Sequence, residues 1–556
     1  MGQINMSSPL IERQRALDAL LQGVDVLVIG GGITGAGVAL DAATRGYRVA
    51  VVEQADFASG TSSRSTKLLH GGLRYVPQFQ IRLVREALEE RDRLRQHAPH
   101  LVRPLPFVVP VYEGMQRPLG LRVPAPLRSL APLGIRVGLV GYDLLARSDL
   151  PHRRLTSDEA LQHVPALRTT GLRAAYLYYD AQTDDVRLTH AVLATARCYG
   201  AITLNYVRAE AVAVGPGFNV ALRDRLMEQE MHVQARHVVN ATGVWAEEVA
   251  AFAGWVPFRI QRSKGVHLIL DCLDLVTDAA LVIPETDDGR LAFLLPWRGR
   301  LILGTTDDPY EGDPARPRTA PGEARYLLNH MNRYFKSPVG PQVVIGAYAG
   351  LRPLVRWSSA RPADLSRDHE VVQHDGGLVS IIGGKLTTYR KMAEDVIDVL
   401  ARRDGLRTPC RTKELVLDGG EDPETVHAQV LSEAATLGLP HATAEYVYQA
   451  YGSRAILLID MLHAESALRR PLVPGRPEIS AEVVLACREE QAVTLADWLI
   501  LRSRLALLDR NHARECAEEV GRLMARELGW TVAEQARQLA TFDAMMNEEL
   551  AFLRGL

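Results

Sequence analysis

The stretch VDVLVIGGGITG, residues 24–35, decides the fold. Its apolar run, rich in Val and Ile, predicts a buried parallel strand. Glycines then follow at the G-x-G-x-x-G spacing, at Gly30, Gly32 and Gly35. An Ala-rich helical pattern continues to Arg45, and a second strand over residues 48–52 delivers Glu53. Together these features predict a βαβ unit of the kind that binds a dinucleotide.

Each glycine of this unit has a separate task. Gly30 permits the tight turn, Gly32 lets the backbone approach a pyrophosphate, and Gly35 lets helix and strand pack closely. The helix N-terminus offers unpaired N–H groups to phosphates. Glu53 is suited to accept hydrogen bonds from a ribose 2′-OH and to repel a 2′-phosphate. The unit alone does not distinguish NAD from FAD.

Size and composition exclude several classes of protein. A chain of 556 residues predicts two or three domains. A net charge of −2 argues against nucleic acid as the main partner. The five cysteines lie far apart, without C-x-x-C or metal-ligand spacing, which fits a reducing compartment and predicts no metal site. No signal peptide and no stretch near the roughly 20 uncharged apolar residues of a spanning helix is found, so we expect a cytoplasmic protein or one on the inner face of the membrane.

Three later segments favour FAD over NAD. The Ser/Thr-rich residues 59–67 offer hydroxyls and backbone donors to a pyrophosphate and ribityl chain. Residues 240–243 (NATG) form a strand-end turn of small residues that suits an adenosine. Gly383-Gly384-Lys385 begins a helix whose dipole would stabilise negative charge at the flavin pyrimidine ring. Each segment alone also fits a solvated loop, a tight turn or a plain helix cap, but their order together predicts FAD.

The expected fold class is α/β, with a Rossmann-like FAD-binding domain interrupted by a β-rich substrate domain and followed by an α-helical C-terminal domain. The FAD-binding domain is expected at 1–100, 190–255 and 345–400. The substrate domain is expected at 101–189 and 256–344, with strands at 264–271, 291–296 and 300–304. Helical patterns dominate 401–556, and we expect this domain either to form a homodimer or to hold the substrate domain.

The order of these motifs resembles the FAD-dependent glycerol-3-phosphate dehydrogenases of the respiratory, membrane-associated type. The resemblance covers most of the chain, and its motifs at 61–75 and 383–390 are far more specific than the dinucleotide fingerprint. The matching stretches are 30–37 (GGGITGAG), 61–75 (TSSRSTKLLHGGLRY), 240–245 (NATGVW), 304–307 (GTTD), 350–354 (GLRPL), 366–368 (SRD), 383–390 (GGKLTTYR) and 488–499 (REEQAVTLADWL).

The motifs and the resemblance together give a set of residues that we expect at the cofactor. These are Gly30, Gly32, Gly35, Glu53, Thr61, Ser62, Lys67, His70, Gly71, Gly72, Val207, Ala241, Thr242, Gly243, Gly384, Lys385, Leu386 and Thr387.

The resemblance also implies a substrate, sn-glycerol 3-phosphate, whose dianionic phosphate calls for guanidinium groups. It places Arg352 and Arg367 at the substrate, Lys385 near the flavin, and Arg74 with Tyr75 on the opposite wall. His267 falls on a strand of the second sheet, where the family carries a substrate-site histidine.

The catalytic residues are expected to be His267, Arg352 and Lys385. His267 is a candidate base because its ordinary pKa lies near neutrality. Lys385 or Arg352 would instead stabilise the developing alkoxide. The identity of the base stays open, since His267 fits a satisfied core histidine equally well.

The electron acceptor implied by the family is a quinone. Residues 101–147 are apolar and basic, with six arginines facing only Glu113 and Asp143. They suit either an anionic membrane surface or a solvent-facing basic lobe. Three other hypotheses for the function stay open: a glycerol-3-phosphate oxidase that uses dioxygen, an FAD-dependent oxidoreductase of amino or hydroxy acids, and a non-catalytic flavin-binding regulator.

Overall fold

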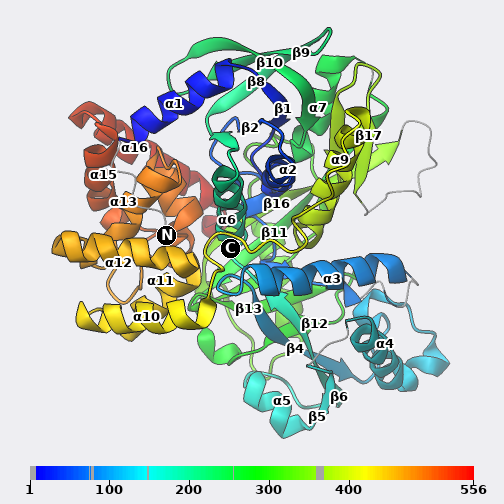
Figure 1. Ribbon diagram of the computed structural model, residues 1–556. Coiled ribbons are helices and arrows are strands. Elements are labelled where there is room, and N and C mark those ends of the chain that lie inside the picture. Colours follow the sequence, from blue (N-terminus) through cyan, green and yellow to red (C-terminus); the bar gives the residue numbers. More distant parts are fainter. Residues whose placement is uncertain (1–7, 74–75, 77–79, 147–149, 255, 358–368) are drawn as a thin grey trace.

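Two β-sheets and a helical domain organise the protein (Figure 1). The computed structural model describes residues 8–73, 76, 80–146, 150–254, 256–357 and 369–556. Within this part of the chain, the fold class expected from the sequence is confirmed: an interrupted nucleotide-binding fold, a second β-rich unit and a helical C-terminal domain.

The first sheet is built around the fingerprint strand. Its strands run in the order β17 (Glu370–Gln373), β18 (Val379–Ile382), β10 (Gln229–Asn240), β1 (Val24–Ile29), β2 (Val49–Val52) and β7 (Ile202–Leu204), and β9 (Phe218–Asp224) and β8 (Val207–Val214) extend from β10. Strand β1 pairs in parallel with both β10 and β2. Such a strand is buried on both faces, which explains its continuous apolar sequence.

Three helices from distant parts of the chain cover this sheet. Helix α2 (Ile33–Thr44) contacts α6 (Asp185–Cys198) and α9 (Tyr389–Arg403). Eleven of its twelve residues are buried, so its small side chains are those that fit between a sheet and two neighbouring helices. The helix that was expected to begin at Gly383-Gly384-Lys385 is present as a short 3-10 turn, η9 (Leu386–Thr388), followed by α9.

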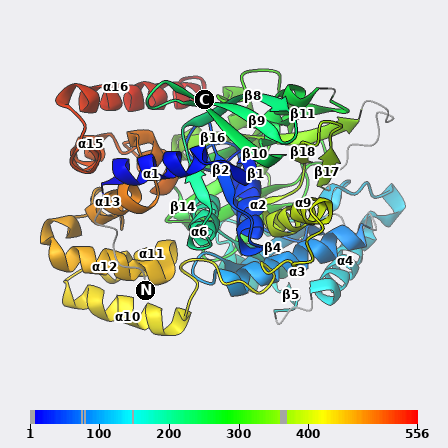
Figure 2. The same cartoon turned by 45° about the horizontal axis from the view of Figure 1, so that its top comes forward.

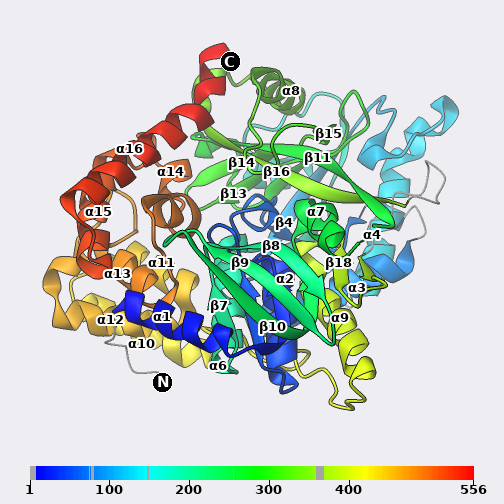
Figure 3. The ribbon, with the colours of Figure 1, turned by 90° about the horizontal axis from the view of Figure 1, so that it is seen from above.

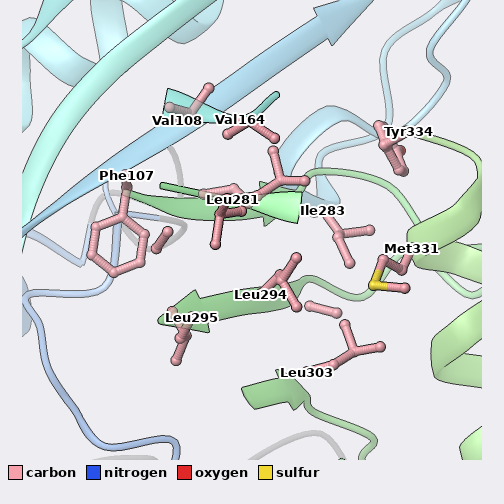
Figure 4. Close-up of a cluster of buried hydrophobic side chains, with 14 of the residues drawn as sticks. Phe107, Val108, Val164, Leu281, Ile283, Leu294, Leu295, Leu303, Met331 and Tyr334 are labelled. Atoms are coloured by element: carbon pink, nitrogen blue, oxygen red, sulfur yellow. The ribbon is translucent and has the colours of Figure 1, made fainter. Parts of the chain in front are cut away.

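The second sheet carries the substrate domain. Its strands follow the order β15 (Asp308–Pro309), β11 (Phe258–Leu270), β14 (Arg300–Gly304), β13 (Ala292–Trp297), β12 (Ala280–Ile283), β4 (Arg103–Tyr112), β6 (Leu172–Gln182) and β3 (Leu68–Leu69), with β16 (Val344–Trp357) on β11 and β5 (Arg153–Leu155) on β6. Its core includes Phe107, Leu281, Leu294 and Leu303, and Met331 packs on it from α8 (Pro321–Asn332) (Figure 4).

The expected boundary at residue 345 does not coincide with a change of sheet. Strand β16 pairs with β11 along its length, so residues up to 357 belong to the substrate sheet. Strand β3 likewise joins this sheet although it lies within the first expected segment, 1–100. The sequence motif GLRPL gave no sign of this because strand pairing depends on a partner some 90 residues away.

The first residues of the apolar, basic segment belong to β4, and its later residues form a helical arm at the outer edge of the substrate domain (Figures 1 and 2). It contains η4 (Ala125–Leu130) and α4 (Ala131–Ala146). The expectation of no stretch near 20 uncharged apolar residues stands, but it does not cover an apolar helix that carries a few charges. Residues 125–146 have the length and mean hydropathy, 1.3, of a membrane-crossing helix, and only 28% of the window is buried. Arg128, Arg136 and Asp143 interrupt it, which is why a search for uncharged stretches missed it.

The C-terminal domain packs beside the first sheet and α6 (Figures 1 and 3). It consists of α10 (Pro423–Thr436), α11 (His441–Tyr451), α12 (Ala455–Ala464), α13 (Ser480–Glu489), α14 (Leu505–Leu508), α15 (Arg514–Leu528) and α16 (Val532–Glu549), and the N-terminal α1 (Pro9–Leu21) contacts α13 and α15. Buried ion pairs connect it to the first domain. Arg187 forms a two-pronged pair with Glu490 at 3.0 and 2.6 Å, and Arg502 pairs with Asp56.

Glu490 tests how much this interface contributes to stability. Arg187 and Arg502 hold the pKa of its carboxyl well below the ordinary range despite burial. A depressed folded-state pKa means that the stabilisation is present above the unfolded-state pKa of about 4.3 and is lost as the pH falls through the folded-state value. We predict that Glu490→Gln costs about 3–5 kcal/mol at neutral pH, because two buried guanidinium groups lose their partner. The thermal unfolding midpoint measures this loss.

The exposed pair of Glu519 with Arg522 provides the control, and Glu519→Gln should change stability by no more than about 0.5 kcal/mol. Equal midpoints for both variants would contradict the prediction.

Candidate active site

The fingerprint glycines are required by close backbone approach. Gly30 has φ +111°, and a Cβ there would lie 2.6 Å from the Ala241 carbonyl oxygen. A Cβ on Gly35 would lie 1.8 Å from the Gly30 carbonyl oxygen. At Gly32 it would meet the Ser62 hydroxyl at 2.9 Å. These three contacts join β1, α2, the turn after β10 and the Ser/Thr-rich loop at one point.

Glu53 lies at the end of β2 and lines the same point. One carboxylate oxygen accepts a hydrogen bond from the Gly31 amide at 2.7 Å, and the other accepts one from the Ala55 amide at 3.0 Å. Burial raises the pKa of Glu53, and these amide donors oppose the shift. The carboxylate therefore orders the fingerprint loop in addition to facing the groove.

A cavity of about 580 Å³ extends from the fingerprint to the start of η9. Twelve of the expected cofactor residues line it: Gly30, Gly32, Glu53, Thr61, Ser62, Val207, Ala241, Thr242, Gly243, Gly384, Lys385 and Leu386. They come from segments more than 300 residues apart in the sequence. Gly35 lies beneath the groove, where it makes room for the helix.

Besides Gly35, five expected cofactor residues lie outside this lining. Lys67 is fully buried, and its ammonium group pairs with Asp185 at 2.6 Å. The His70 amide donates to the Thr387 hydroxyl at 3.2 Å, and the Gly71 amide donates to the Tyr142 hydroxyl at 2.9 Å. Gly72 has φ +83° and is buried. These residues lie where the chain leaves the groove, because β3 belongs to the substrate sheet.

Several groove residues were not predicted from the sequence. Arg64 and Trp245 lie within quoted motifs, and Leu351 and Pro353 flank Arg352 in the GLRPL motif. Along a strand, alternate residues face opposite sides. If residues 350–354 had been predicted as a strand, this alternation would have placed Leu351 and Pro353 on one face and Arg352 on the other.

His267 and Arg352 lie on neighbouring strands of the substrate sheet. His267 stands opposite Tyr348, and Ser263 stands opposite Arg352. The His267 ring stacks on Tyr348 with 4.8 Å between centroids, and its Nε2 lies 2.9 Å from the Thr66 hydroxyl. Burial, followed by the charges of Arg352 and Lys67, holds the pKa of His267 well below its ordinary value. The imidazole is therefore neutral at pH 7.

Two glycines make room for these side chains. A Cβ on Gly265 would lie 2.6 Å from the Arg352 guanidinium, and one on Gly304 would lie 2.3 Å from the His267 ring. The guanidinium donates to the Asp307 carboxylate at 3.0 Å and to the Thr305 hydroxyl at 3.2 Å. Both glycines belong to the site, although neither was predicted.

Lys385 lies at the cofactor groove. It precedes η9, its ammonium nitrogen is buried, and it lines the groove with Gly384. The other predicted substrate residues, Arg74, Tyr75 and Arg367, lie outside the described residues. Within the described residues, no group of three or more His, Cys, Asp or Glu side chains is arranged to hold a metal.

The groove fits an extended FAD. A glycine-lined helix N-terminus lies at one end, where a pyrophosphate needs close backbone approach, and hydroxyls of Thr61 and Ser62 follow. A buried lysine stands at the other end, beside the start of η9. The donors suit phosphates at one end and an anionic reduced ring at the other.

Comparison with known proteins agrees with this class, a flavin-dependent oxidoreductase. The FAD dependent oxidoreductase family profile matches residues 25–390, and the profile of the C-terminal domain of alpha-glycerophosphate oxidase matches residues 410–535. L-alpha-glycerophosphate oxidase from Mycoplasma pneumoniae shares the fold at 15% identity, with a TM-score of 0.54 over 68% of this chain and 94% of its own.

Closer relatives define the family. The mitochondrial glycerol-3-phosphate dehydrogenase of Macaca fascicularis is 36% identical over 99% of this chain and 76% of its own length. Glycerol-3-phosphate dehydrogenase 2 of Mycobacterium bovis is 36% identical over 95% of this chain and 88% of its own. The glycerol-3-phosphate dehydrogenase of Bacillus halodurans, solved with FAD, superposes with a TM-score of 0.80 at 28% identity over 98% of both chains. The chain belongs to the FAD-dependent glycerol-3-phosphate dehydrogenase family, and its cofactor is FAD.

Gly30→Ala tests the groove. The variant combines an unfavourable positive φ with a Cβ 2.6 Å from the Ala241 carbonyl, so the end of β1 must move away from the turn after β10. We predict loss of most bound flavin, measured as the ratio of flavin to protein absorbance after purification.

Gly46→Ala is the matched control, because Gly46 has φ +92° with nothing within 4 Å of its would-be Cβ. It carries the backbone strain without the clash and should retain its flavin. Equal flavin loss in both variants would contradict the proposed role of the close approach.

Proposed function

We propose that this protein oxidises sn-glycerol 3-phosphate to dihydroxyacetone phosphate and passes the electrons to a quinone. The proposal rests on the family to which the chain belongs and on a groove, lined by Lys385, that suits FAD. It is supported by His267 and Arg352, which lie on neighbouring strands, close enough for the Arg352 charge to lower the pKa of the imidazole. Bound FAD supplies the hydride acceptor for the carbon that bears the secondary alcohol. The protein must then bind a phosphate dianion and take one proton.

Arg352 is suited to the phosphate. Its guanidinium has five N–H donors, and the contacts with Asp307, Thr305 and the Thr306 carbonyl set its orientation. Arg74, Tyr75 and Arg367 complete the proposed substrate site, on the family resemblance of their motifs. A site with several guanidinium groups favours a phosphate over the single carboxylate of an amino acid.

His267 is suited to accept the alcohol proton. Its pKa is depressed, so it is unprotonated at neutral pH, and its Nδ1 is buried without a hydrogen-bond partner within the described residues. In the tautomer in which Nε2–H donates to Thr66, Nδ1 carries the lone pair. Lys385 would stabilise negative charge on the substrate oxygen or the reduced ring.

The membrane is the proposed place of electron delivery. Helix α4 is apolar on two faces: Ile135, Leu139 and Tyr142 are buried, whereas Leu133, Val137, Val140 and Leu144 are 43–75% exposed at helical spacing. Nearby Arg122 and Arg136 are exposed. An exposed apolar stripe with arginines beside it suits the headgroup boundary of an anionic membrane. We therefore propose peripheral association with the inner face of the cell membrane.

The reaction is tested by adding sn-glycerol 3-phosphate to the holoenzyme without oxygen. We predict bleaching of the flavin absorbance, with dihydroxyacetone phosphate formed in equal amount. Arg352→Met should slow this reduction by more than about 100-fold, because the phosphate loses a charge-assisted partner, and should retain FAD.

Arg356→Met is the control on the same strand, since Arg356 is exposed and stands opposite Arg259, away from His267. It should reduce at the wild-type rate. An absence of bleaching in the wild-type protein would refute the proposed reaction.

Membrane association is tested by co-sedimentation with vesicles of phosphatidylcholine and phosphatidylglycerol. We predict salt-sensitive binding that Val137→Glu/Leu144→Glu weakens by about 10-fold or more, because two charges enter the apolar stripe. Turnover with a soluble electron acceptor should stay unchanged.

Val532→Glu provides the control, because Val532 is 86% exposed on the distant α16. Its binding should equal that of the wild type. Equal binding by the double variant would show that α4 is not the docking face.

Dioxygen is the second candidate acceptor. It is favoured by the profile match of the C-terminal domain to that of alpha-glycerophosphate oxidase. Peroxide formed in air, one molecule per substrate oxidised, would select it over the quinone.

A further inference from the structure

One short loop joins the cofactor groove to His267. Residues 63–67 follow the groove residues Thr61 and Ser62 and precede β3. Thr66 in this loop contacts the His267 Nε2 at 2.9 Å, and the Ser65 carbonyl accepts a hydrogen bond from the Tyr348 hydroxyl at 2.9 Å. Tyr348 is also the ring on which His267 stacks. The position of loop 63–67 therefore sets two of the contacts that orient His267.

The loop is wrapped around one buried carboxylate, that of Asp185 in the first turn of α6. The Ser65 amide and hydroxyl donate to Asp185 at 3.1 and 2.7 Å. The Lys67 ammonium donates to both of its oxygens, at 2.7 and 2.6 Å, and to the Ser63 carbonyl at 2.7 Å. The Lys67 and Asp185 side chains are both 0% exposed. Neither group is part of the proposed chemistry, yet together they fix the whole loop.

The last partner of this carboxylate comes from the C-terminal domain. Arg504, directly before α14, donates to the Asp185 carboxylate at 2.7 Å and to the Ser63 carbonyl at 3.1 Å. Its side chain is 2% exposed, and its backbone has φ +63°. A buried arginine in the left-handed conformation is costly, and this one spans more than 300 residues of sequence to reach the loop.

We propose that Arg504 is a positioning residue for the substrate site: through Asp185 it fixes loop 63–67, and through Thr66 and Tyr348 it holds His267 in place. The inference rests on the proposed function for the role of His267, but the effect of Arg504 on the loop does not. It also gives the C-terminal domain a part in the site.

Each donor to the Asp185 carboxylate has a defined position around it. Asp185 accepts from one ammonium, one guanidinium, one hydroxyl and one amide, so every oxygen lone pair has a fixed donor. Burial lowers the pKa of Lys67 to about 8, Asp185 opposes this shift, and Arg504 adds to it. Without Arg504 the carboxylate and the Ser63 carbonyl each lose a donor in a dry site, and the loop can adopt alternative arrangements.

Other buried ion pairs join the two domains besides the contact of Arg504. Arg187 with Glu490 and Arg502 with Asp56 join the same two domains without touching the loop. Arg300 offers a matched control: it donates from the substrate domain to the Leu508 carbonyl at the other end of α14, at 2.9 Å. Arg300→Met weakens the seating of α14 and leaves loop 63–67 intact.

The first experiment needs neither substrate nor turnover. Hydrogen–deuterium exchange reports the Ser65 amide, which donates to Asp185, and the Lys67 amide, which donates to the Ser65 hydroxyl at 3.0 Å. We expect exchange of these two amides to be about 10-fold faster or more in Arg504→Met than in the wild type and in Arg300→Met. Unchanged exchange in Arg504→Met would overturn the proposal, whatever the substrate proves to be.

The second experiment measures anaerobic flavin reduction by sn-glycerol 3-phosphate. Arg504→Met should lower the limiting rate by about 10-fold with the KM within about twofold, because the base and not the phosphate contact is displaced. Arg504→Lys, which keeps a donor to Asp185, should restore most of the rate. Thr66→Val should reproduce the defect with the domain interface untouched.

The two hypotheses fail in different ways. Reduction rates in Arg504→Met equal to those of Arg300→Met would overturn the positioning role while the proposed reaction stands. A wild-type flavin that sn-glycerol 3-phosphate does not bleach would refute the proposed reaction, and the exchange experiment would still decide whether Arg504 orders the loop.

Discussion

The absence of a side chain at Gly30 and Gly35 is the constraint on which the rest of the structure depends. A Cβ on Gly35 would lie 1.8 Å from the Gly30 carbonyl oxygen, and a Cβ on Gly30 would lie 2.6 Å from the Ala241 carbonyl oxygen. Helix α2 can therefore begin directly at the ends of β1 and β10. Helix α2 also contacts α6 and α9, and residues near 62, 241 and 385 meet around the groove at its N-terminus.

The residues that were expected to approach a cofactor through their backbone line one groove, and there is a physical reason for this. Close approach, positive φ and helix N-termini are local properties that glycine spacing encodes, so Gly32, Thr242 and Gly384 were placed in the groove without any knowledge of tertiary structure. Long charged side chains were harder to place. Lys67 was expected at the cofactor, but the direction of its side chain depends on Asp185, 118 residues later, and no local pattern records that partner. The register of β16 against β11 was missed for the same reason.

The exposed apolar face of α4 could not be recognised from the composition of residues 101–147. By composition, residues 101–147 are apolar and basic, which suits either an anionic membrane surface or a solvent-facing basic lobe. With the helix in place, Ile135 and Leu139 face the core while Val137 and Leu144 face solvent. A helix that only covers a core needs one apolar face, and the exposed second face is the feature on which the proposed membrane association rests. The inner face of this helix also carries Tyr142, which holds the Gly71 amide and donates to Asp180 at 2.7 Å.

The domain interface raises the question of why charges and not apolar side chains were used at its centre. Apolar contacts would bind the domains as tightly, since a buried ion pair gains little over a well-packed hydrophobic replacement. They have no direction, however, and cannot assign a carboxylate oxygen to each donor. The Asp185 cluster does so for loop 63–67, because Lys67, Ser65 and Arg504 each occupy a defined position around one carboxylate. Buried charge is thus concentrated where the loop must stay in one place to keep Thr66 against His267. The geometry of a site built on the first two domains depends in this way on the third.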